Sequence, residues 1–328
     1  MPEDFTNSAF ELSLETLPAG AFPAPRPEAA HVFAMGIGDP ASPRGYAVMR
    51  QRRTAAMVMI IGWTCDPADA EELAQAVEAL AKDRGAILIR ATPELTGAID
   101  ALALADTGRG YSQRWLGTAI DSAHDTGQFT QTTGFTCGPI SLAMAMTTDV
   151  NRSLEVEIWR EATTMIGLTG PGGCDPYGLA LAAARRGFDV TLWFDAGEAV
   201  LLDRANTDEK KDLMRFVQAE FREKAQETLL VLDTAMTEQT LTEVVGKGAQ
   251  VLLLIDQCHT HDHHAPHWIL VHAEQDGIFL VNDPWAEPDD GETVADVDAI
   301  PIARETLMQM AAYGDPAYHA AIVLEEQK

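Results

Sequence analysis

The chain has 328 residues, of which 46% are hydrophobic, so it can bury a large core and is long enough for two domains. Its 50 acidic residues outnumber its 23 basic residues, and the formal net charge is −27. This charge opposes binding to nucleic acid or to an anionic membrane surface and favours a basic or neutral partner. The opening stretch MPEDFTNSAFELSLE lacks a basic segment followed by an apolar one, and no long uncharged apolar run occurs. We therefore expect a globular, cytoplasmic protein.

The first hundred or so residues are expected to form a separate, smaller α/β unit. Strands at 31–36, within 46–63 and at 86–92 alternate with helices over 67–82 and 93–104. This order resembles part of an acetyltransferase fold, which holds the pyrophosphate of coenzyme A with a basic, glycine-rich turn before its main helix. The corresponding link here, GWTCDPADAEE, is acidic and would repel a pyrophosphate. The resemblance therefore implies a catalytically inactive remnant, used for packing or for substrate selection, that binds no cofactor.

A glycine-rich turn at 107–110 is the predicted linker, which gives an N-terminal domain at 1–108 and a second domain at 109–328. The elements expected in the second domain are a helix after residue 137, a helix over 154–165, a glycine-rich loop over 167–177, a helix over 176–187, a strand at 190–194, a charged helical insert around 203–246, a central strand at 250–255 and a hairpin over 267–283. Gly172 and Gly173 lie in the glycine-rich loop, which is predicted to line a substrate cleft.

Cys137, in QTTGFTCGP, has the surroundings of a nucleophile. The thiolate is the reactive form of cysteine, and the unpaired N–H groups at a helix N-terminus or an adjacent imidazole lower the thiol pKa. Pro139 is well tolerated in the first turn of the apolar helix that follows. The Cys137 amide and the Gln131 side chain, six residues upstream, are predicted to donate hydrogen bonds to a developing oxyanion.

The base and the group that orients it are predicted from HWILVHAEQDGIFLVNDPW. Two apolar runs separated by turn residues predict a hairpin, with His267 and Asp283 near its open end. A three-residue loop places 267 opposite 283, whereas a two-residue Asp276-Gly277 loop pairs 283 with 270. The catalytic interpretation therefore requires the wider loop or a β-bulge. Trp268 and Trp285 flank the pair and are candidates for the walls of the substrate site, although aromatic residues at strand ends are more often core.

The other cysteines and the histidine-rich loop offer competing interpretations. Cys65, Cys174 and Cys258 form no CxxC motif and are expected to be free thiols, with Cys174 packing a loop. The loop CHTHDHHAPHW offers Cys258, His259, His261, Asp262, His263 and His264 as ligands for zinc or nickel. Alternate residues of a short loop rarely face one centre, so we expect no metal and a polar lid beside the cleft.

The stretches QTTGFTCGPISLAMAM, IWREATTMIGLTGPGGCDPYGLALAAARRGFDV and HAPHWILVH with VNDPW resemble the C39-like peptidases, a family of papain-fold cysteine proteases. They resemble more narrowly a bacterial subgroup often joined to an acetyltransferase-like domain. The resemblance covers about residues 111–328 and implies an α+β fold in which a cysteine-bearing helix packs on an antiparallel sheet. It also implies Cys137 as nucleophile, His267 as general base, Asp283 as orienter and Gln131 in the oxyanion hole. The separation of Cys137 and His267 exceeds that in transporter-borne leader peptidases, so their preference for a Gly-Gly leader does not carry over.

Two classes of function follow from these residues. The first is a cysteine hydrolase that cleaves a peptide or peptide-like amide through a thioester, with acyl transfer or transpeptidation as alternative fates of the same thioester. The second is a non-catalytic module that binds a peptide in the cleft. In both cases the resemblance implies a peptide-like partner, such as the product of a peptide ligase encoded nearby. Neither nucleic acid nor a membrane is expected as a partner.

Overall fold

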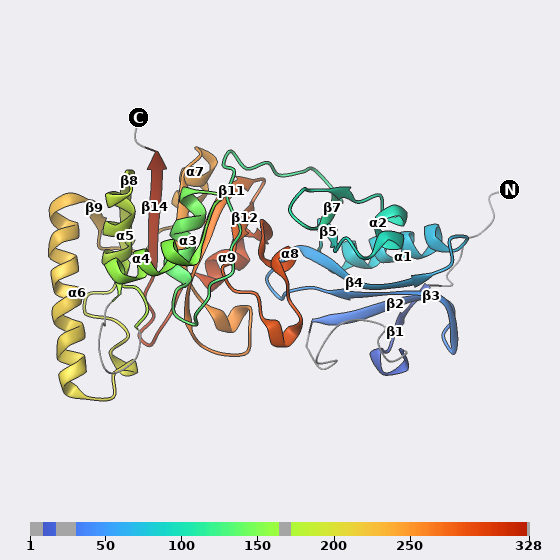
Figure 1. Cartoon of the computed structure of the whole chain (residues 1–328), viewed down its shortest axis with the longest axis horizontal. Helices are drawn as coiled ribbons and strands as arrows, with labels where there is room; N and C mark the ends of the chain where they lie inside the picture. The colour runs from blue at the N-terminus through green and yellow to red at the C-terminus, as the bar shows by residue number, and fades with distance from the viewer. Residues whose placement is uncertain (1–8, 18–30, 164–171, 327–328) are drawn as a thin grey trace. The chain divides into compact units, whose positions relative to one another are not determined.

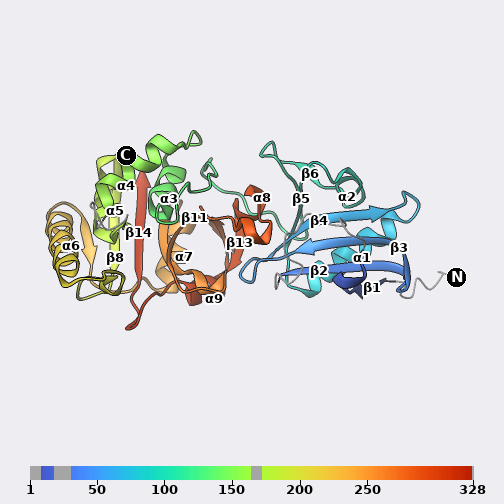
Figure 2. The ribbon, with the colours of Figure 1, turned by 60° about the horizontal axis from the view of Figure 1, so that its bottom comes forward.

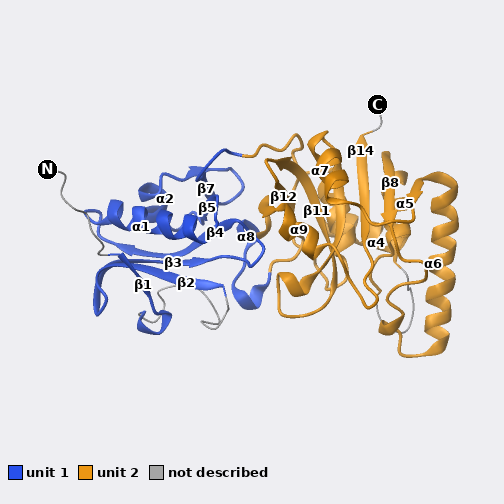
Figure 3. Ribbon diagram, turned by 180° about the vertical axis from the view of Figure 1, so that it is seen from behind, with its two compact units in different colours: residues 1–119, 287–296 blue, residues 120–286, 297–328 orange. Residues whose placement is uncertain are grey.

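The structure is a computed structural model that describes residues 9–17, 31–163 and 172–326. It divides the chain into two units, which Figure 3 distinguishes by colour. Unit 1 comprises residues 1–119 and 287–296, and unit 2 comprises 120–286 and 297–328. Both units combine helices with a sheet, and the expected α+β character of the chain is confirmed.

Unit 1 is built on one sheet whose described strands follow the order β1-β2-β3-β4-β5-β7-β6 (Figure 1). The strands are β1 (Ala9–Leu12), β2 (Val32–Asp39), β3 (Ser42–Arg50), β4 (Met57–Cys65), β5 (Leu88–Ala91), β6 (Ala105–Asp106) and β7 (Ser112–Trp115). Helix α1 (Ala70–Asp83) connects β4 to β5, which run parallel, and α2 (Thr96–Ala101) follows β5. The apolar face of α1 packs on β2, β3 and β4, so the strands and helices predicted for this part of the chain are confirmed.

The segment 287–296 belongs to unit 1 because buried arginines bind it. The Arg50 guanidinium donates to both carboxylate oxygens of Asp296, at 2.9 and 2.7 Å, and both side chains are almost fully buried. Arg52 pairs with Glu292 at 2.8 Å, and Arg90 donates to a main-chain carbonyl of the same segment. Within this segment lies a 3-10 helix (Pro288–Asp290). The short helix α8 (Val294–Val297) begins near the end of the segment and extends one residue beyond it.

The expected domain boundary at 108/109 falls inside unit 1. The residues predicted as a linker, 107–110, form the turn between β6 and β7, where the Thr107 N–H and hydroxyl both donate to the Tyr111 carbonyl. β7 lies between β5 and β6 in the sheet, so the chain completes this sheet before it enters unit 2 at residue 120. The glycines at 108 and 110, both with positive φ, indicate a turn, and sequence alone does not distinguish such a turn from a linker.

Unit 2 has a second sheet, with the order β13-β12-β11-β10-β14-β8-β9 (Figure 2). The strands are β8 (Phe188–Phe194), β9 (Leu230–Leu232), β10 (Gln250–Asp256), β11 (Pro266–Gln275), β12 (Ile278–Asn282), β13 (Ile300–Ala303) and β14 (Ala320–Glu326). The helices are α3 (Cys137–Met146), α4 (Arg152–Ala162), α5 (Pro176–Arg185), α6 (Asp208–Thr228), α7 (Glu238–Gly246) and α9 (Arg304–Met310). All described pairings in this sheet are antiparallel except that of β8 with β9.

Side chains along the central strands point alternately to the two faces of the sheet, and helices cover both faces. Leu252 and Leu254 of β10, with Trp268 and Leu270 of β11, share one core with α3, α4 and α5. The intervening residues of β10 are also buried, and α7 packs against β10 and β11. Because both faces of the central strands are covered, β10 is apolar at successive positions instead of alternating.

The charged insert is largely helical, as predicted, and consists of α6, β9 and α7. Helix α6 begins at Thr207, whose side chain accepts a hydrogen bond from the Lys210 N–H, and α7 begins in the same way at Thr237. Strand β9, which extends the sheet by pairing parallel to β8, is not predicted, because three residues carry too little periodicity. Residues 164–171, which include the end of the predicted helix at 154–165 and much of the predicted glycine-rich loop, lie outside the described residues.

Two further expectations concern membranes and disulfides. No helix within 9–17, 31–163 or 172–326 has both the length and the apolar character needed to cross a bilayer. Cys65, Cys137, Cys174 and Cys258 are all free thiols, as expected.

Candidate active site

Cys137 is the first residue of α3 and is 9% exposed. Helix α3 packs on β11, and the Ser141 hydroxyl donates to the Trp268 carbonyl at 3.0 Å. Gly138 makes this approach possible: a Cβ there would lie 3.0 Å from the Leu179 side chain and 3.2 Å from the Trp268 ring. The predicted position of the thiol at a helix N-terminus, against the strand that carries His267, is thus present in the structure.

A β-bulge brings His267 and Asp283 to the same face of the hairpin. The turn is the two-residue Asp276-Gly277 loop, since Gln275 pairs with Ile278, and this register alone would pair Asp283 with Leu270. The pairing shifts between Val271 and Ala273, so that Leu270 pairs with Asn282 instead. Asp283, the next residue, then lies opposite Ile269. Ile269 and His267 are two residues apart on one strand, so Asp283 and His267 are diagonal neighbours on the same face of the sheet. The bulge required by the sequence argument therefore exists, and the wider loop does not.

The three side chains lie in one row. His267 Nε2 lies 2.7 Å from Asp283 Oδ1, and both residues are 3% exposed. The Cys137 thiol is close enough to the His267 ring for the two groups to shift each other's pKa, and Nδ1 is the ring nitrogen that Asp283 does not occupy. Asp283 is held in turn by the Trp285 N–H, which donates to the same Oδ1 at 2.8 Å. The carboxylate thus fixes the ring orientation, as an orienting residue must.

Charge in this buried row favours a thiolate beside an imidazolium. Burial by itself lowers the pKa of His267, but the charge and hydrogen bond of Asp283, together with Cys137, raise it to about 10. Burial by itself raises the pKa of Cys137, but the hydrogen bond and charge of His267 and the amides of Trp268 and Gly138 lower it below its ordinary value. The geometry therefore makes the nucleophilic thiolate easier to form at Cys137 than at an ordinary thiol.

Gln131 lies in the same region but its side chain faces a backbone group. Its N–H donates to the Pro284 carbonyl at 2.8 Å, which connects the segment before Cys137 to the segment after Asp283. Its side-chain NH2 donates to the Thr133 carbonyl at 2.7 Å. Because an NH2 group has two protons, one remains for an oxyanion, and the predicted role of Gln131 stays a prediction.

Glu155 of α4 is a positioning residue that the sequence argument missed. It is fully buried, and its carboxylate accepts hydrogen bonds from the Thr132 N–H at 2.8 Å, the Thr132 hydroxyl at 2.7 Å and the Thr136 hydroxyl. These contacts fix the loop that leads into Cys137. The sequence does carry a signal for this role. Glu155 lies on the same helix face as Ile158 and Ala162, which is buried, and a buried carboxylate requires hydrogen-bond partners.

His272, the extra residue of the bulge, is also a positioning residue. Its Nδ1 lies 2.9 Å from the Ser122 hydroxyl, and its Nε2 lies 3.0 Å from Asn282 Oδ1. The Asn282 amide donates to the Gly127 carbonyl at 3.0 Å, so the residue before Asp283 is fixed on both sides. These bonds hold the register on which the His267–Asp283 contact depends.

A cleft of about 340 Å³ opens at the nucleophile. Cys137, Gly172, Gly173 and Trp268 line it, as predicted for a substrate site. Trp285, also predicted to wall the site, is not among the described residues that line this cleft. Its backbone N–H donates a hydrogen bond to Asp283. Cys174 also lines the cleft, but burial raises its pKa well above the ordinary value, which keeps it a protonated packing residue at neutral pH.

The histidine-rich loop brings together a smaller ligand set than its sequence offers. Among the described residues, potential ligand atoms of Asp256, Cys258 and His264 lie within 4.8 Å of one another. His264 Nδ1 is 2.7 Å from Asp256 Oδ2, and the Cys258 N–H donates to Oδ1 of the same carboxylate. His263 contacts Gln257 and His261 contacts Thr260, so these rings face different partners. The absence of a metal remains an expectation.

Comparison with known proteins places the chain in a family. Residues 127–325 match the sequence model of the Peptidase_C39 like family. The peptidase domain of Streptococcus ComA, a bifunctional ABC transporter involved in a quorum-sensing pathway, is 16% identical, with 62% of this chain and 100% of that chain covered and a TM-score of 0.32. A Bacillus anthracis protein assigned as a C39-like peptidase is 11% identical, covering 64% and 100%, with a TM-score of 0.35. No curated protein matches the chain. The family match spans more than half of the sequence, and the chain belongs to the Peptidase_C39 like family.

Proposed function

We propose that the protein is a cysteine hydrolase that cleaves a peptide or peptide-like amide through a thioester on Cys137. The single observation that carries the proposal is the buried row of Cys137, His267 and Asp283, in which the thiol pKa is lowered and the imidazole pKa is raised. A packing cysteine needs neither an orienting carboxylate behind its neighbour nor an open cleft in front of it.

In the proposed reaction each group has a role. The Cys137 thiolate attacks the carbonyl carbon, and the resulting oxyanion lies near the α3 N-terminus, where the Cys137 amide and the Gln131 NH2 group are the proposed donors. His267 gives its proton to the leaving amine, and the C–N bond breaks to leave a thioester. Water, deprotonated by His267, then attacks the thioester and releases the acid. An amine in place of water would give acyl transfer.

The pH dependence follows from the two shifted groups. Turnover requires Cys137 deprotonated and His267 protonated, so activity rises as pH passes the lowered pKa of Cys137. It falls again as pH passes about 10, where His267 loses the proton that the leaving amine needs.

Alkylation by iodoacetamide near neutral pH tests the proposal. We expect labelling of Cys137 at a rate at least about tenfold above that of a free thiol, because the thiolate fraction is larger. His267→Ala should remove this advantage, while Cys174 in the same cleft should label slowly in both proteins. Labelling of Cys137 as slow as a free thiol's, with no effect of His267→Ala, would instead support a non-catalytic peptide-binding module.

For unit 1 we propose a non-catalytic role, as its resemblance to a degenerate acetyltransferase implies. The observation in support is the turn before α1, where Asp69, Glu71 and Glu72 surround the helix N-terminus. Arg44, the nearby cation, already pairs with Asp69 and with Glu72, the latter at 2.8 Å. A pyrophosphate would have to displace these carboxylates from the positive helix end.

A further inference from the structure

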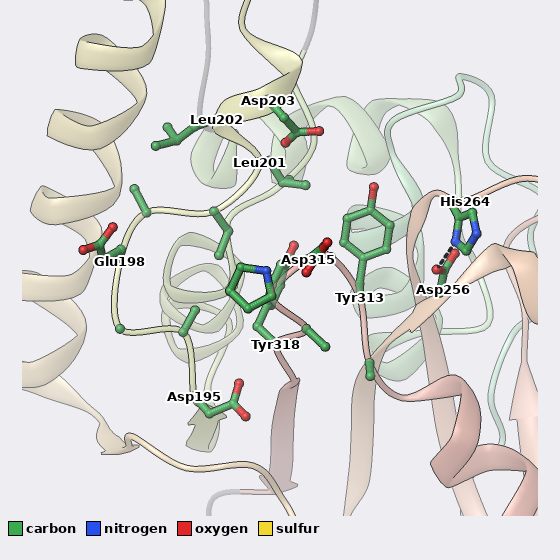
Figure 4. A pocket seen from close by; sticks show the side chains of 18 residues that line it. Asp195, Glu198, Leu201, Leu202, Asp203, Asp256, His264, Tyr313, Asp315 and Tyr318 are labelled. Carbon is green, nitrogen blue, oxygen red and sulfur yellow. Dashed lines mark hydrogen bonds and ion pairs between the residues drawn. The ribbon is translucent and has the colours of Figure 1, made fainter.

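A second cavity, of about 980 Å³, adjoins the catalytic cleft in unit 2 (Figure 4). It is formed by residues 195–203, which follow β8, by residues 312–318, which precede β14, and by Asp256 and His264. Val200, Leu201 and Tyr318 line both this cavity and the cleft that contains Cys137. A chain bound across the nucleophile can therefore reach the cavity.

The cavity is lined by carboxylates and by no lysine or arginine among its described residues. Two of the carboxylates have histidine partners: Asp195 contacts His319 at 2.8 Å, and Asp256 contacts His264 at 2.7 Å. The other three, Glu198, Asp203 and Asp315, make no hydrogen bond or ion pair with another described residue. Figure 4 shows their side chains around the cavity, with Glu198 and Asp203 on the segment after β8 and Asp315 on the segment before β14.

Tyr318 supplies an observation independent of this charge. It is 8% exposed, lies where the two cavities join, and its hydroxyl hydrogen-bonds no other described residue. The hydroxyl is therefore available to accept a hydrogen bond from a group bound in the cavity. The Tyr313 ring, 6.0 Å away and edge-on to Tyr318, adds a second aromatic surface, and the guanidinium of Arg204 in the adjoining cleft already donates to its hydroxyl at 3.2 Å.

We infer that this cavity binds a cationic side chain, lysine or arginine, of a peptide substrate whose scissile bond lies at Cys137. The inference rests on the proposed function and specifies its substrate class. Carboxylates on several sides, an acceptor hydroxyl and aromatic rings match the donors and the charge of an ammonium or guanidinium group. An acidic side chain would be repelled, and a neutral one would form no ion pair with the carboxylates.

A peptide-retention experiment tests the inference. Immobilised Cys137→Ala protein is incubated with an equimolar synthetic peptide library in which each varied position carries lysine, arginine, norleucine or glutamate, and retained peptides are quantified by mass spectrometry. We expect lysine and arginine peptides to be retained about tenfold over norleucine peptides. Adding Glu198→Gln, Asp203→Asn and Asp315→Asn should abolish this preference. All three positions are exposed, so folding should be retained, as a thermal unfolding curve verifies.

The matched control removes three exposed carboxylates from α6 by Glu220→Gln, Glu223→Gln and Glu227→Gln. It changes the net charge equally and should keep the preference, which separates the cavity from the general negative charge of the protein. Equal loss in both triple variants, equal retention of norleucine peptides, or retention of no peptide overturns the inference. Fast, His267-dependent alkylation of Cys137 in wild-type protein prepared in parallel would show that the proposed function stands even where the inference fails.

Discussion

The N-termini of α1 and α3 show two uses of the same electrostatic feature. Both present unpaired N–H groups that favour negative charge. At α1 the chain supplies this charge itself, through Asp69, Glu71 and Glu72, and Arg44 neutralises part of it. At α3 the first turn has no acidic residue, and the group there whose anionic form is favoured is the Cys137 thiol, the pKa of which is lowered. The two helix N-termini therefore differ in the group that meets their positive potential. At α1 it is a set of acidic side chains, and at α3 it is a thiol that can ionise and react.

The largest effect is expected from Asp283→Asn, which removes the carboxylate behind His267. The asparagine no longer favours the imidazolium, so the rate of peptide cleavage should fall about 10²- to 10⁴-fold. The exposed change Asp66→Asn, beside α1, is the matched control and should leave the rate unchanged. A fall of less than about threefold in Asp283→Asn would show that the α3 site needs no orienting charge.

Glu155→Gln tests whether the loop before α3 is as firmly held as its contacts indicate. An amide in place of the carboxylate turns an NH2 group toward some of the three donors, and we expect about 2–4 kcal/mol of lost stability in urea unfolding. Glu157→Gln, on the same helix but with its side chain 65% exposed, should cost at most about 1 kcal/mol. Equal costs for the two changes would contradict the positioning role of Glu155.

These two residues also show how far the sequence alone could go. Asp283 was predicted because it lies near the open end of the predicted hairpin, where a wider loop or a bulge brings it to His267, and because the C39-like resemblance implies it. Glu155 was missed because its role depends on where α4 lies relative to the loop at 132–136. Burial of a glutamate among apolar helix positions was the only signal that sequence carries.

The β-bulge illustrates a limit of a different kind. Alternation predicted the strands, and the catalytic interpretation predicted that either a longer loop or a bulge must exist. The bulge is held by contacts of His272 with Asn282 on the facing strand and with Ser122, and Ser122 is 150 residues away in the sequence. The attachment of 287–296 to unit 1 was unpredictable for the same reason, since Arg50 and Asp296 are 246 residues apart.

The smallest effect is expected at α1, where acetyl-CoA should not bind. At micromolar concentrations it should leave the thermal unfolding midpoint of the protein unchanged, because the acidic first turn repels a pyrophosphate. A clear rise in the midpoint would show that unit 1 binds the coenzyme, and the contrast between the two helix ends would then be wrong.

The central claim is that His267 and the α3 N-terminus hold Cys137 as a thiolate, and the pH dependence of its alkylation tests this most directly. The rate of iodoacetamide labelling follows the thiolate fraction, so in the wild-type protein its midpoint should lie clearly below that of a free thiol, about 8.5. In His267→Ala, burial is no longer offset by the imidazolium, and the midpoint should move above the free-thiol value. Midpoints equal to that of a free thiol in both proteins would contradict the account.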